Sequence, residues 1–274
     1  MKQIIKWVLT LLVIFVLWIG ALYFFQERFL FFPSSEIADQ PVKSSLSWDE
    51  VSWQTTDGNT LHGRWMETKG ADGTVLYFHG NAGNISHLNG QLYIFQVLNK
   101  NALIFDYRGF GESDGIIQKE QDLYEDSLSA LTFLTEEKNI SPSDIILWGQ
   151  SLGSAFAVEL AQKEPFAAVV LDFPFLSLPL VSQIHYPFLP VQWLLKYKFN
   201  NREKIKNIQS PLLIFYSNND EVVPATQSET LFQQAKEPKK IVELAGSHNR
   251  AISESIEIYL REARDFLQNT SFHE

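Results

Sequence analysis

A serine lies between two glycines in the stretch Gly-Gln-Ser-Leu-Gly at 149–153, directly after the apolar run at 145–148. A serine hydroxyl is a poor nucleophile at neutral pH unless a base lies within hydrogen-bond reach and a third group orients that base. A sharp strand-to-helix turn would hold the hydroxyl out of a sheet, and such a turn is so crowded that its flanking residues must be small. The pattern therefore predicts Ser151 as a nucleophile, with an ordinary tight turn as the alternative.

The chain has six histidines, of which His185, His248 and His273 follow the serine. Where a nucleophile sits on a turn of this kind, the order along the chain is serine, acid, histidine. His248 lies in a loop between the apolar run at 239–246 and a helical segment, which is where the base is expected. We therefore predict His248 as the base, with a solvated loop histidine as the alternative.

The orienting acid must lie between the serine and the histidine in the chain. Asp220 follows the apolar run PLLIF, whose strand immediately precedes the strand of the histidine. Its neighbour Glu221 and the more distant Asp172, which ends the preceding strand, remain alternatives. Buried beside the imidazole, Asp220 would fix the tautomer and stabilise the imidazolium. We therefore expect Asp220 to be the acid.

Negative charge that develops on a substrate oxygen requires preorganised N–H donors. One expected donor is the backbone N–H of Leu152, the residue after the predicted nucleophile, and the other should lie in the loop after an earlier strand. The sequence there reads LYFHGNAGN, where Gly80 allows a sharp turn. We predict the N–H of Asn81 as the second donor, with Ala82 as the alternative.

Apolar runs that favour strands alternate with helical stretches along most of the chain. The predicted strands lie at 76–80, 102–109, 144–151, 167–174, 211–218 and 239–246, and the predicted helices at 84–99, 119–137, 152–163, 225–236 and 251–268. Short apolar strands separated by helices indicate an α/β fold, a mostly parallel central sheet with helices on both faces. Segments 48–54 and 61–68 alternate in polarity and predict an antiparallel pair at one edge.

The N-terminal residues 7–25 are apolar and carry no charge. This length is close to the roughly 20 residues with which a helix spans a bilayer. A cleaved signal peptide is the alternative, but its apolar run should be shorter, and cleavage after Ala21 would place Ile19 where a small residue is required. We predict an uncleaved transmembrane helix.

The charges around this helix predict its orientation. Lys2, Lys6 and the terminal amine precede it, whereas Arg28 follows it. Positive charge concentrates on the cytoplasmic side of a membrane. The N-terminus is therefore expected in the cytoplasm and the rest of the chain outside it.

We predict an anchor at 1–25, a linker at 26–45 and an α/β domain at 46–274. The stretch 173–208 is rich in Phe, Leu, Pro, Tyr and Trp and is too long for an ordinary connection of about 2–6 residues. We predict a lid-like insertion that faces a substrate, with a structural excursion as the alternative. The apolar patch at 29–32 is expected to pack on the domain rather than lie in a membrane interface.

Composition excludes several classes of function. The chain has 274 residues, no cysteine and a net charge of −10. The absence of cysteine excludes disulfides and thiolate chemistry, and the lack of a basic cluster argues against nucleic-acid binding. The histidines lack metal-ligand spacing. Gly109 and Gly111 begin a dinucleotide pattern, but Asp114 occupies its third glycine position. We therefore expect no metal and no cofactor.

Five motifs in order resemble the α/β-hydrolase superfamily, and more narrowly its single-pass, membrane-anchored members of the serine-aminopeptidase-like branch. They are FHGNAGN at 78–84, DYRGFGESDG at 106–115, GQSLG at 149–153, NNDEVVP at 218–224 and GSHN at 246–249. The resemblance spans about residues 28–268. It implies a triad of Ser151, Asp220 and His248, with oxyanion donors near Asn81 and Leu152. Tyr216-Ser217 replaces a His-Gly pair that is common in the family, which would alter access to the site.

These patterns together predict a membrane-anchored serine hydrolase that cleaves an ester or thioester through an acyl-enzyme. The aromatic insertion favours an apolar acyl group, so the expected partner is a small or lipid-like ester. One alternative is a peptidase with an aminopeptidase-like preference, which an acidic pocket for a substrate amine would favour. The other is a non-catalytic scaffold on the same fold. No oligomeric state is predicted.

Overall fold

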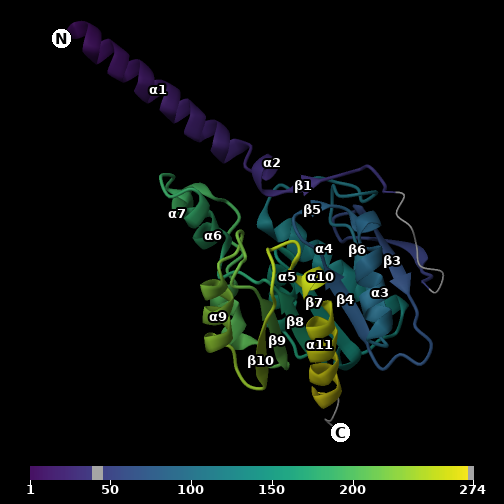
Figure 1. The fold of residues 1–274 in the computed structure, drawn as a ribbon. Helices are drawn as coiled ribbons and strands as arrows, with labels where there is room; N and C mark the ends of the chain where they lie inside the picture. The colour runs from purple at the N-terminus through teal and green to yellow at the C-terminus, as the bar shows by residue number, and fades with distance from the viewer. Residues whose placement is uncertain (39–45, 271–274) are drawn as a thin grey trace.

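The computed structural model describes residues 1–38 and 46–270 (Figure 1). Its centre is an eight-stranded sheet in the order β10-β9-β8-β7-β4-β6-β3-β2. The strands are β2 (Asp49–Gln54), β3 (Thr60–Met66), β4 (Thr74–Phe78), β6 (Asn101–Phe105), β7 (Ile145–Gln150), β8 (Ala168–Asp172), β9 (Leu212–Tyr216) and β10 (Lys239–Glu243). All neighbours from β10 to β6 pair in parallel, whereas β3 pairs antiparallel with both β6 and β2. The predicted parallel sheet and its antiparallel edge pair are confirmed.

The central strands are apolar along their whole length because helices cover both of their faces. All residues of β4 and β8 are buried. In β7, Leu147 points into one apolar cluster, whereas Ile146 and Trp148 point into the other. Successive strand residues face opposite sides of a sheet, so a strand covered on both sides needs a continuous apolar run. This is the run that precedes the predicted nucleophile.

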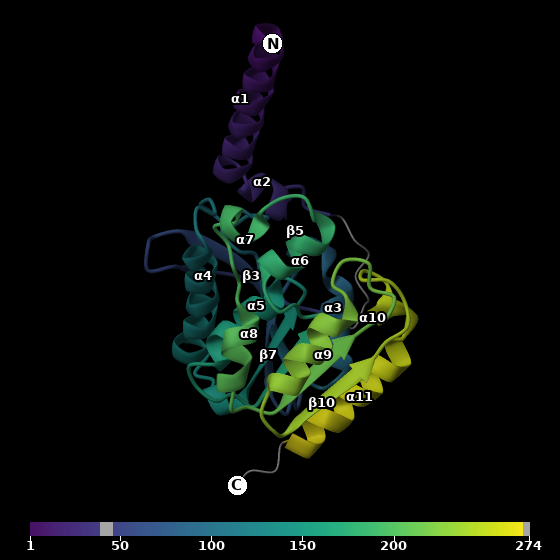
Figure 2. The same ribbon diagram turned by 90° about the vertical axis from the view of Figure 1, so that its left-hand side faces the viewer.

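The two faces of the sheet are covered by different helices (Figure 2). The helices α4 (Glu120–Thr132), α5 (Gly153–Ala161) and α9 (Ala225–Gln234) contribute to one apolar cluster, and α3 (Asn89–Val97) and α11 (Ile256–Thr270) to the other. Among the short helices, α8 (Asn201–Lys204) lies between β8 and β9, and α10 (Ala251–Glu254) lies between β10 and α11. Two predicted helices are shorter than expected, since a 3₁₀ turn precedes α3 and a π turn follows α4.

The N-terminal helix α1 (Lys2–Phe24) extends away from the sheet, and none of its residues is buried (Figure 1). It is long and apolar enough to cross a membrane, a property that signal sequences share. The segment that follows contains α2 (Glu27–Leu30) and β1 (Phe32–Pro33), and β1 pairs in parallel with β5 (Ala82–Gly83). Residues 26–38 of the predicted linker therefore lie against the domain, whereas 39–45 fall outside the described residues.

The apolar patch at 29–32 is divided between core and surface. Phe31 is buried at 5% exposure and contacts the rings of Tyr197 and Phe199. Phe29 and Phe32 are 60% and 53% exposed. The expectation that this patch packs on the domain thus holds for Phe31 and is wrong for Phe29 and Phe32, because a helical turn and a strand alternate their side chains between core and solvent.

The insertion at 173–208 contains α6 (Leu178–His185), α7 (Val191–Leu194) and, near its end, α8. Both views place α6 and α7 beside α2, at the end of the molecule from which α1 leaves (Figures 1 and 2). The insertion follows β8, so it rises from the carboxyl ends of the parallel strands.

Candidate active site

Ser151, Asp220 and His248 meet at the carboxyl edge of the sheet, in the loops after β7, β9 and β10. The His248 Nε2 atom lies 3.0 Å from the Ser151 Oγ atom. The Nδ1 atom of the same ring lies 2.6 Å from the Asp220 Oδ2 atom. The structure thus brings the three predicted residues into one hydrogen-bonded chain, because parallel strands place their carboxyl ends side by side.

The turn that carries Ser151 is strained and crowded. Ser151 has a φ of 51°, in the left-handed region, and its N–H donates to the Asp172 carbonyl oxygen at 2.8 Å. A Cβ atom on Gly149 would collide with the Gly153 carbonyl group, and one on Gly153 would collide with the Phe78 carbonyl oxygen. Both glycines are therefore required by close approach, and strain of this kind is typical of functional turns.

The Asp220 carboxylate is oriented by its own loop. Its Oδ1 atom accepts hydrogen bonds from the backbone N–H groups of Val222 at 2.8 Å and Val223 at 2.7 Å. Its side chain is 1% exposed. With Oδ1 occupied, Oδ2 is directed at the His248 ring, which fixes that ring as the tautomer with its proton on Nδ1.

The two alternative acids contact other groups. The Glu221 Oε2 atom accepts a hydrogen bond from the His248 backbone N–H at 3.1 Å, so it holds the loop rather than the ring. Asp172 is fully buried, and its Oδ2 atom accepts from Trp148 Nε1 and the Tyr259 hydroxyl, each at 2.8 Å. Burial raises the pKa of Asp172 to about 7. Neither carboxylate reaches the imidazole ring of His248.

Of the other two downstream histidines, only His185 lies within the described residues, and its ring contacts a group other than Ser151. The His185 Nε2 atom lies 2.8 Å from the Val222 carbonyl oxygen, and the residue lines the cavity described below. His273 lies outside the described residues.

The loop after β4 carries Asn81, one of the two predicted oxyanion donors, whereas Leu152 follows β7. A Cβ atom built on Gly80 would lie 4.0 Å from the Ser151 Cβ atom, so this loop lies directly against the nucleophile. Among the described residues, neither the Asn81 N–H nor the Leu152 N–H donates to a backbone carbonyl in the loops and turns. Both residues line the same cavity as Ser151.

The sequence reasoning missed two supports of this loop. His79 is buried, burial lowers its pKa to about 4, and its Nδ1 atom lies 2.7 Å from the Gly80 carbonyl oxygen. The second support comes from β1, because the Phe32 N–H donates to the Asn81 carbonyl oxygen at 2.8 Å. The Asn81 side chain also donates to the Leu30 carbonyl oxygen at 3.1 Å. The motif HGN signalled the first support, whereas no local pattern signalled the second.

A cavity of about 660 Å³ opens over Ser151. Its volume is within the usual range of about 300–1,000 Å³ for small-molecule sites. Three groups of residues line it: the segment Phe29, Leu30, Phe31 and Phe32; the loops that carry the triad and Asn81; and the insertion residues Phe175, Leu178, Val181 and His185. Residues of the insertion therefore line this cavity, and the segment after α1 forms a wall that was not predicted.

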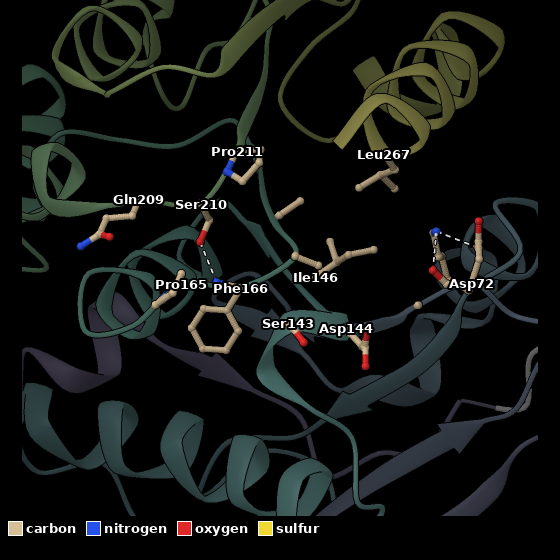
Figure 3. A pocket seen from close by; sticks show the side chains of 14 residues that line it. Asp72, Ser143, Asp144, Ile146, Pro165, Phe166, Gln209, Ser210, Pro211 and Leu267 are labelled. Atoms are coloured by element: carbon tan, nitrogen blue, oxygen red, sulfur yellow. Dashed lines mark hydrogen bonds and ion pairs between the residues drawn. The ribbon is translucent and has the colours of Figure 1, made fainter. Parts of the chain in front are cut away.

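A second cavity of about 550 Å³ lies at the opposite edge of the sheet (Figure 3). It is lined by residues that precede the strands, such as Gly73 before β4 and Pro211 before β9. Its charged groups include Lys100, whose Nζ atom lies 2.8 Å from the Asp72 Oδ1 atom. The described residues that line it include two serines and no histidine, so they provide no nucleophile–base pair. The catalytic candidate is therefore the cavity at the carboxyl edge.

Comparison with known proteins agrees with this geometry. Residues 69–202 match the family described as serine aminopeptidase, S33. The chain is 37% identical to an uncharacterized protein of Mycobacterium tuberculosis (strain ATCC 25618 / H37Rv), over 90% of this chain and 88% of that one. It is 30% identical to protein bem46 of Schizosaccharomyces pombe, over 81% and 79% of the two chains. The chain belongs to the α/β-hydrolase family.

Solved structures show the same fold. The α/β hydrolase superposes on an esterase of Pyrococcus furiosus, Pf2001, with a TM-score of 0.73 and 19% identity, over 88% of this chain and 98% of that chain. An acetyl xylan esterase from Paenibacillus sp. R4 gives a TM-score of 0.68 and 19% identity, over 85% and 86% of the two chains.

Proposed function

We propose that this α/β hydrolase is a membrane-anchored serine hydrolase that cleaves a carboxylic ester or thioester with an apolar acyl group. The observation that carries the proposal is the hydrogen-bonded chain from Ser151 through His248 to Asp220 at the base of the cavity. A serine needs a base and an orienting acid to act as a nucleophile, and this arrangement provides both.

The reaction follows from the directions of these hydrogen bonds. As the Ser151 Oγ atom bonds to the acyl carbon, His248 Nε2 takes the hydroxyl proton, and Asp220 stabilises the imidazolium. The carbonyl oxygen becomes an oxyanion that the Asn81 and Leu152 N–H groups stabilise. The bond from the acyl carbon to the leaving oxygen or sulfur then breaks, and that atom takes the proton from His248. Water repeats the sequence on the acyl-enzyme and releases the acid.

The walls of the cavity favour an apolar acyl group over a peptide amine. Phenylalanine, leucine and valine side chains from the segment 29–32 and from the insertion line it. An aminopeptidase-like site would need a carboxylate to pair with the free amino group of its substrate. No Asp or Glu occurs among the described residues that line the cavity. This argues for the ester or thioester and against the aminopeptidase alternative.

The anchor completes the proposal. Helix α1 remains uncleaved and spans the membrane, with Lys2 and Lys6 in the cytoplasm and the hydrolase domain outside it. Single introduced cysteines, labelled with a membrane-impermeant maleimide before and after lysis of the cells, test this orientation, since the chain has no native cysteine. Reaction of a cysteine at residue 2 with a membrane-impermeant maleimide before lysis would contradict it.

A fluorophosphonate probe tests the catalytic proposal directly. Such a probe reacts with an activated serine, so we expect the detergent-solubilised full chain to be labelled, and Ser151→Ala and His248→Ala not to be. The rates at which the full chain hydrolyses esters of graded acyl length and an amino-acid amide would then distinguish esterase from aminopeptidase activity. A folded wild type that neither labels nor hydrolyses any ester would favour a non-catalytic scaffold.

A further inference from the structure

Exposed aromatic side chains are concentrated in two segments of the domain. Of the described residues after Phe25, every exposed Phe, Tyr or Trp lies in 29–32 or 184–193. The aromatic surface consists of Phe29, Phe32, Ile184, Tyr186, Phe188 and Trp193. Phe188 and Trp193 are 98% and 87% exposed. Aromatic residues exposed to this degree and gathered in one place mark an interaction surface.

The two segments are held together at the end of α1. The Gln26 Oε1 atom accepts the Lys196 backbone N–H at 2.7 Å, and the Lys196 Nζ atom lies 3.3 Å from the Glu27 Oε1 atom. The Lys196 ammonium also lies 5.0 Å from the Tyr23 ring centroid, in the last turn of α1. Figures 1 and 2 both show α7 next to α2, at the base of α1. The insertion and the segment after the span therefore form one unit.

The connection from the span to this unit is short. Only Phe25 and Gln26 separate the last residue of α1 from α2. Three Cα–Cα steps reach at most about 11 Å. The headgroup layer on one side of a bilayer is about 5–8 Å thick. A membrane that holds α1 therefore brings α2 and the insertion attached to it to its surface.

The charge of the insertion also suits a membrane surface. The chain carries a net charge of −10, yet no Asp or Glu occurs between residues 173 and 202. Lys196, Lys198 and Arg202 lie in this stretch, and Arg28 lies in α2. Aromatic residues and basic side chains are enriched at the interface between lipid and water, where carboxylates would be repelled by lipid phosphates.

The aromatic surface is continuous with the cavity over Ser151. Phe29 and Phe32 belong to both, and α6 contributes Leu178, Val181 and His185 to the cavity wall, while its Ile184 and the following Tyr186 are exposed. An acyl chain that leaves the bilayer at this surface can therefore pass along apolar side chains to the nucleophile.

We propose that the aromatic surface docks onto the bilayer that holds α1, and that the cavity takes its ester substrate from that bilayer. The substrate class is then a membrane-resident lipid ester. This inference rests on the proposed function for its substrate, whereas the docking itself does not depend on catalysis.

Spin labels test the docking. Because the chain lacks cysteine, Phe188→Cys and Trp193→Cys can each carry a single nitroxide label in the full chain, reconstituted in phosphatidylcholine vesicles. Ile116→Cys and Leu128→Cys are matched controls, since both side chains are exposed and apolar and lie outside the aromatic surface. We expect labels at 188 and 193 to collide with oxygen, which concentrates in the bilayer, and labels at 116 and 128 to collide with a water-soluble nickel complex. Water exposure at all four positions would overturn the docking.

Substrate access is tested with the variant F188S/W193S, whose two positions do not line the cavity. Hydrolysis of a long-chain ester embedded in the vesicles should fall about tenfold or more, because the variant loses its interfacial contact. Hydrolysis of a water-soluble acetyl ester and fluorophosphonate labelling should stay within about twofold of wild type. If hydrolysis of both esters changed by the same factor, the inference that the substrate comes from the bilayer would be overturned. A wild type that docks by spin label but hydrolyses neither ester would instead refute the proposed hydrolysis and leave the docking standing.

Discussion

The two edges of the central sheet each carry a cavity of similar size, about 660 Å³ and about 550 Å³, but they differ in chemistry. At the carboxyl edge, the Ser151 Oγ and His248 Nε2 atoms lie 3.0 Å apart, and Asn81 and Leu152, whose amides are the proposed oxyanion donors, line the same cavity. At the amino edge, Lys100 forms an ion pair with Asp72, and no histidine occurs among the described residues that line the cavity. A cavity alone therefore does not mark a reactive site.

The difference follows from the direction of the strands. In a parallel sheet, each strand leads into its helix at the carboxyl edge, so the positive ends of helix dipoles face that edge. Helix α5 begins at Gly153, two residues after the predicted nucleophile, where it favours developing negative charge. At the amino edge helices end, and a cation such as Lys100, three residues after the end of α3, suits that position. The predictions below test this contrast between the edges, beginning with the largest effect.

Replacing a serine at the carboxyl edge should abolish activity, whereas replacing one at the amino edge should leave it nearly unchanged. Ser151→Ala removes the nucleophile and should lower kcat/KM for an ester by at least about 10⁴-fold. Ser143→Ala, at the amino edge, should leave kcat/KM within about twofold of wild type. Steady-state hydrolysis of a chromogenic ester measures both. Comparable losses in the two variants would remove the distinction between the cavities.

Replacing an acid at each edge should show a similar contrast. Asp220→Asn keeps the size of the side chain but no longer fixes the His248 tautomer, so kcat should fall by about 10³–10⁴-fold. Asp144→Asn, at the amino edge, should have no measurable effect on kcat. Glu221→Gln should cost less than Asp220→Asn, since Glu221 accepts a hydrogen bond from the His248 backbone N–H, whereas Asp220 contacts the ring. If Glu221→Gln proved as damaging as Asp220→Asn, the role of the acid would have to be reassigned.

Asp172 ends its strand at the carboxyl edge but lies in the core, so it should affect stability more than catalysis. Burial raises the pKa of Asp172 from 3.8 to about 7, so between these values the native state binds more protons than the unfolded state. This carboxyl therefore makes the free energy of unfolding fall as pH rises from about 4 to about 7. Asp172→Asn should remove that contribution and keep kcat within about threefold, because the backbone carbonyl that accepts the Ser151 N–H remains.

Urea unfolding in detergent at pH 5 and pH 8 measures this contribution. Burial also raises the pKa of Asp106 to about 7 and of Asp126 to about 6, so the variant should retain part of the pH dependence. An unchanged difference between the two pH values would contradict a raised pKa at Asp172.

The ion pair at the amino edge should affect stability alone. The Lys100 side chain is buried, whereas Asp72 is half exposed. Asp72→Ala leaves a buried ammonium with fewer partners and should destabilise the fold by about 1–2 kcal/mol. Lys100→Met removes the charge together with the pair and should change stability by less than about 1 kcal/mol. Both variants should retain wild-type kcat; a loss of activity in Lys100→Met would connect the two cavities.

The sequence by itself determined the sheet, the serine turn and the order of the site residues. The unbroken apolar strands and the glycines around Ser151 can be recognised in short stretches of sequence, because a strand covered on both faces needs a continuous apolar run and a strand-to-helix nucleophile turn needs small flanking residues. The order serine, acid, histidine along the chain predicted that the base would follow the last strand, where His248 lies.

Only the tertiary structure decided which acid reaches the imidazole and which segments enclose the cavity. Glu221 and Asp220 are adjacent, and backbone hydrogen bonds within the folded loop point one at the ring and the other at the backbone. The pairing of β1 with β5 brings Phe32 to Asn81, although the two are far apart in the chain. Contacts of this kind depend on how distant segments pack, and the periodicity of a single stretch carries no information about that packing.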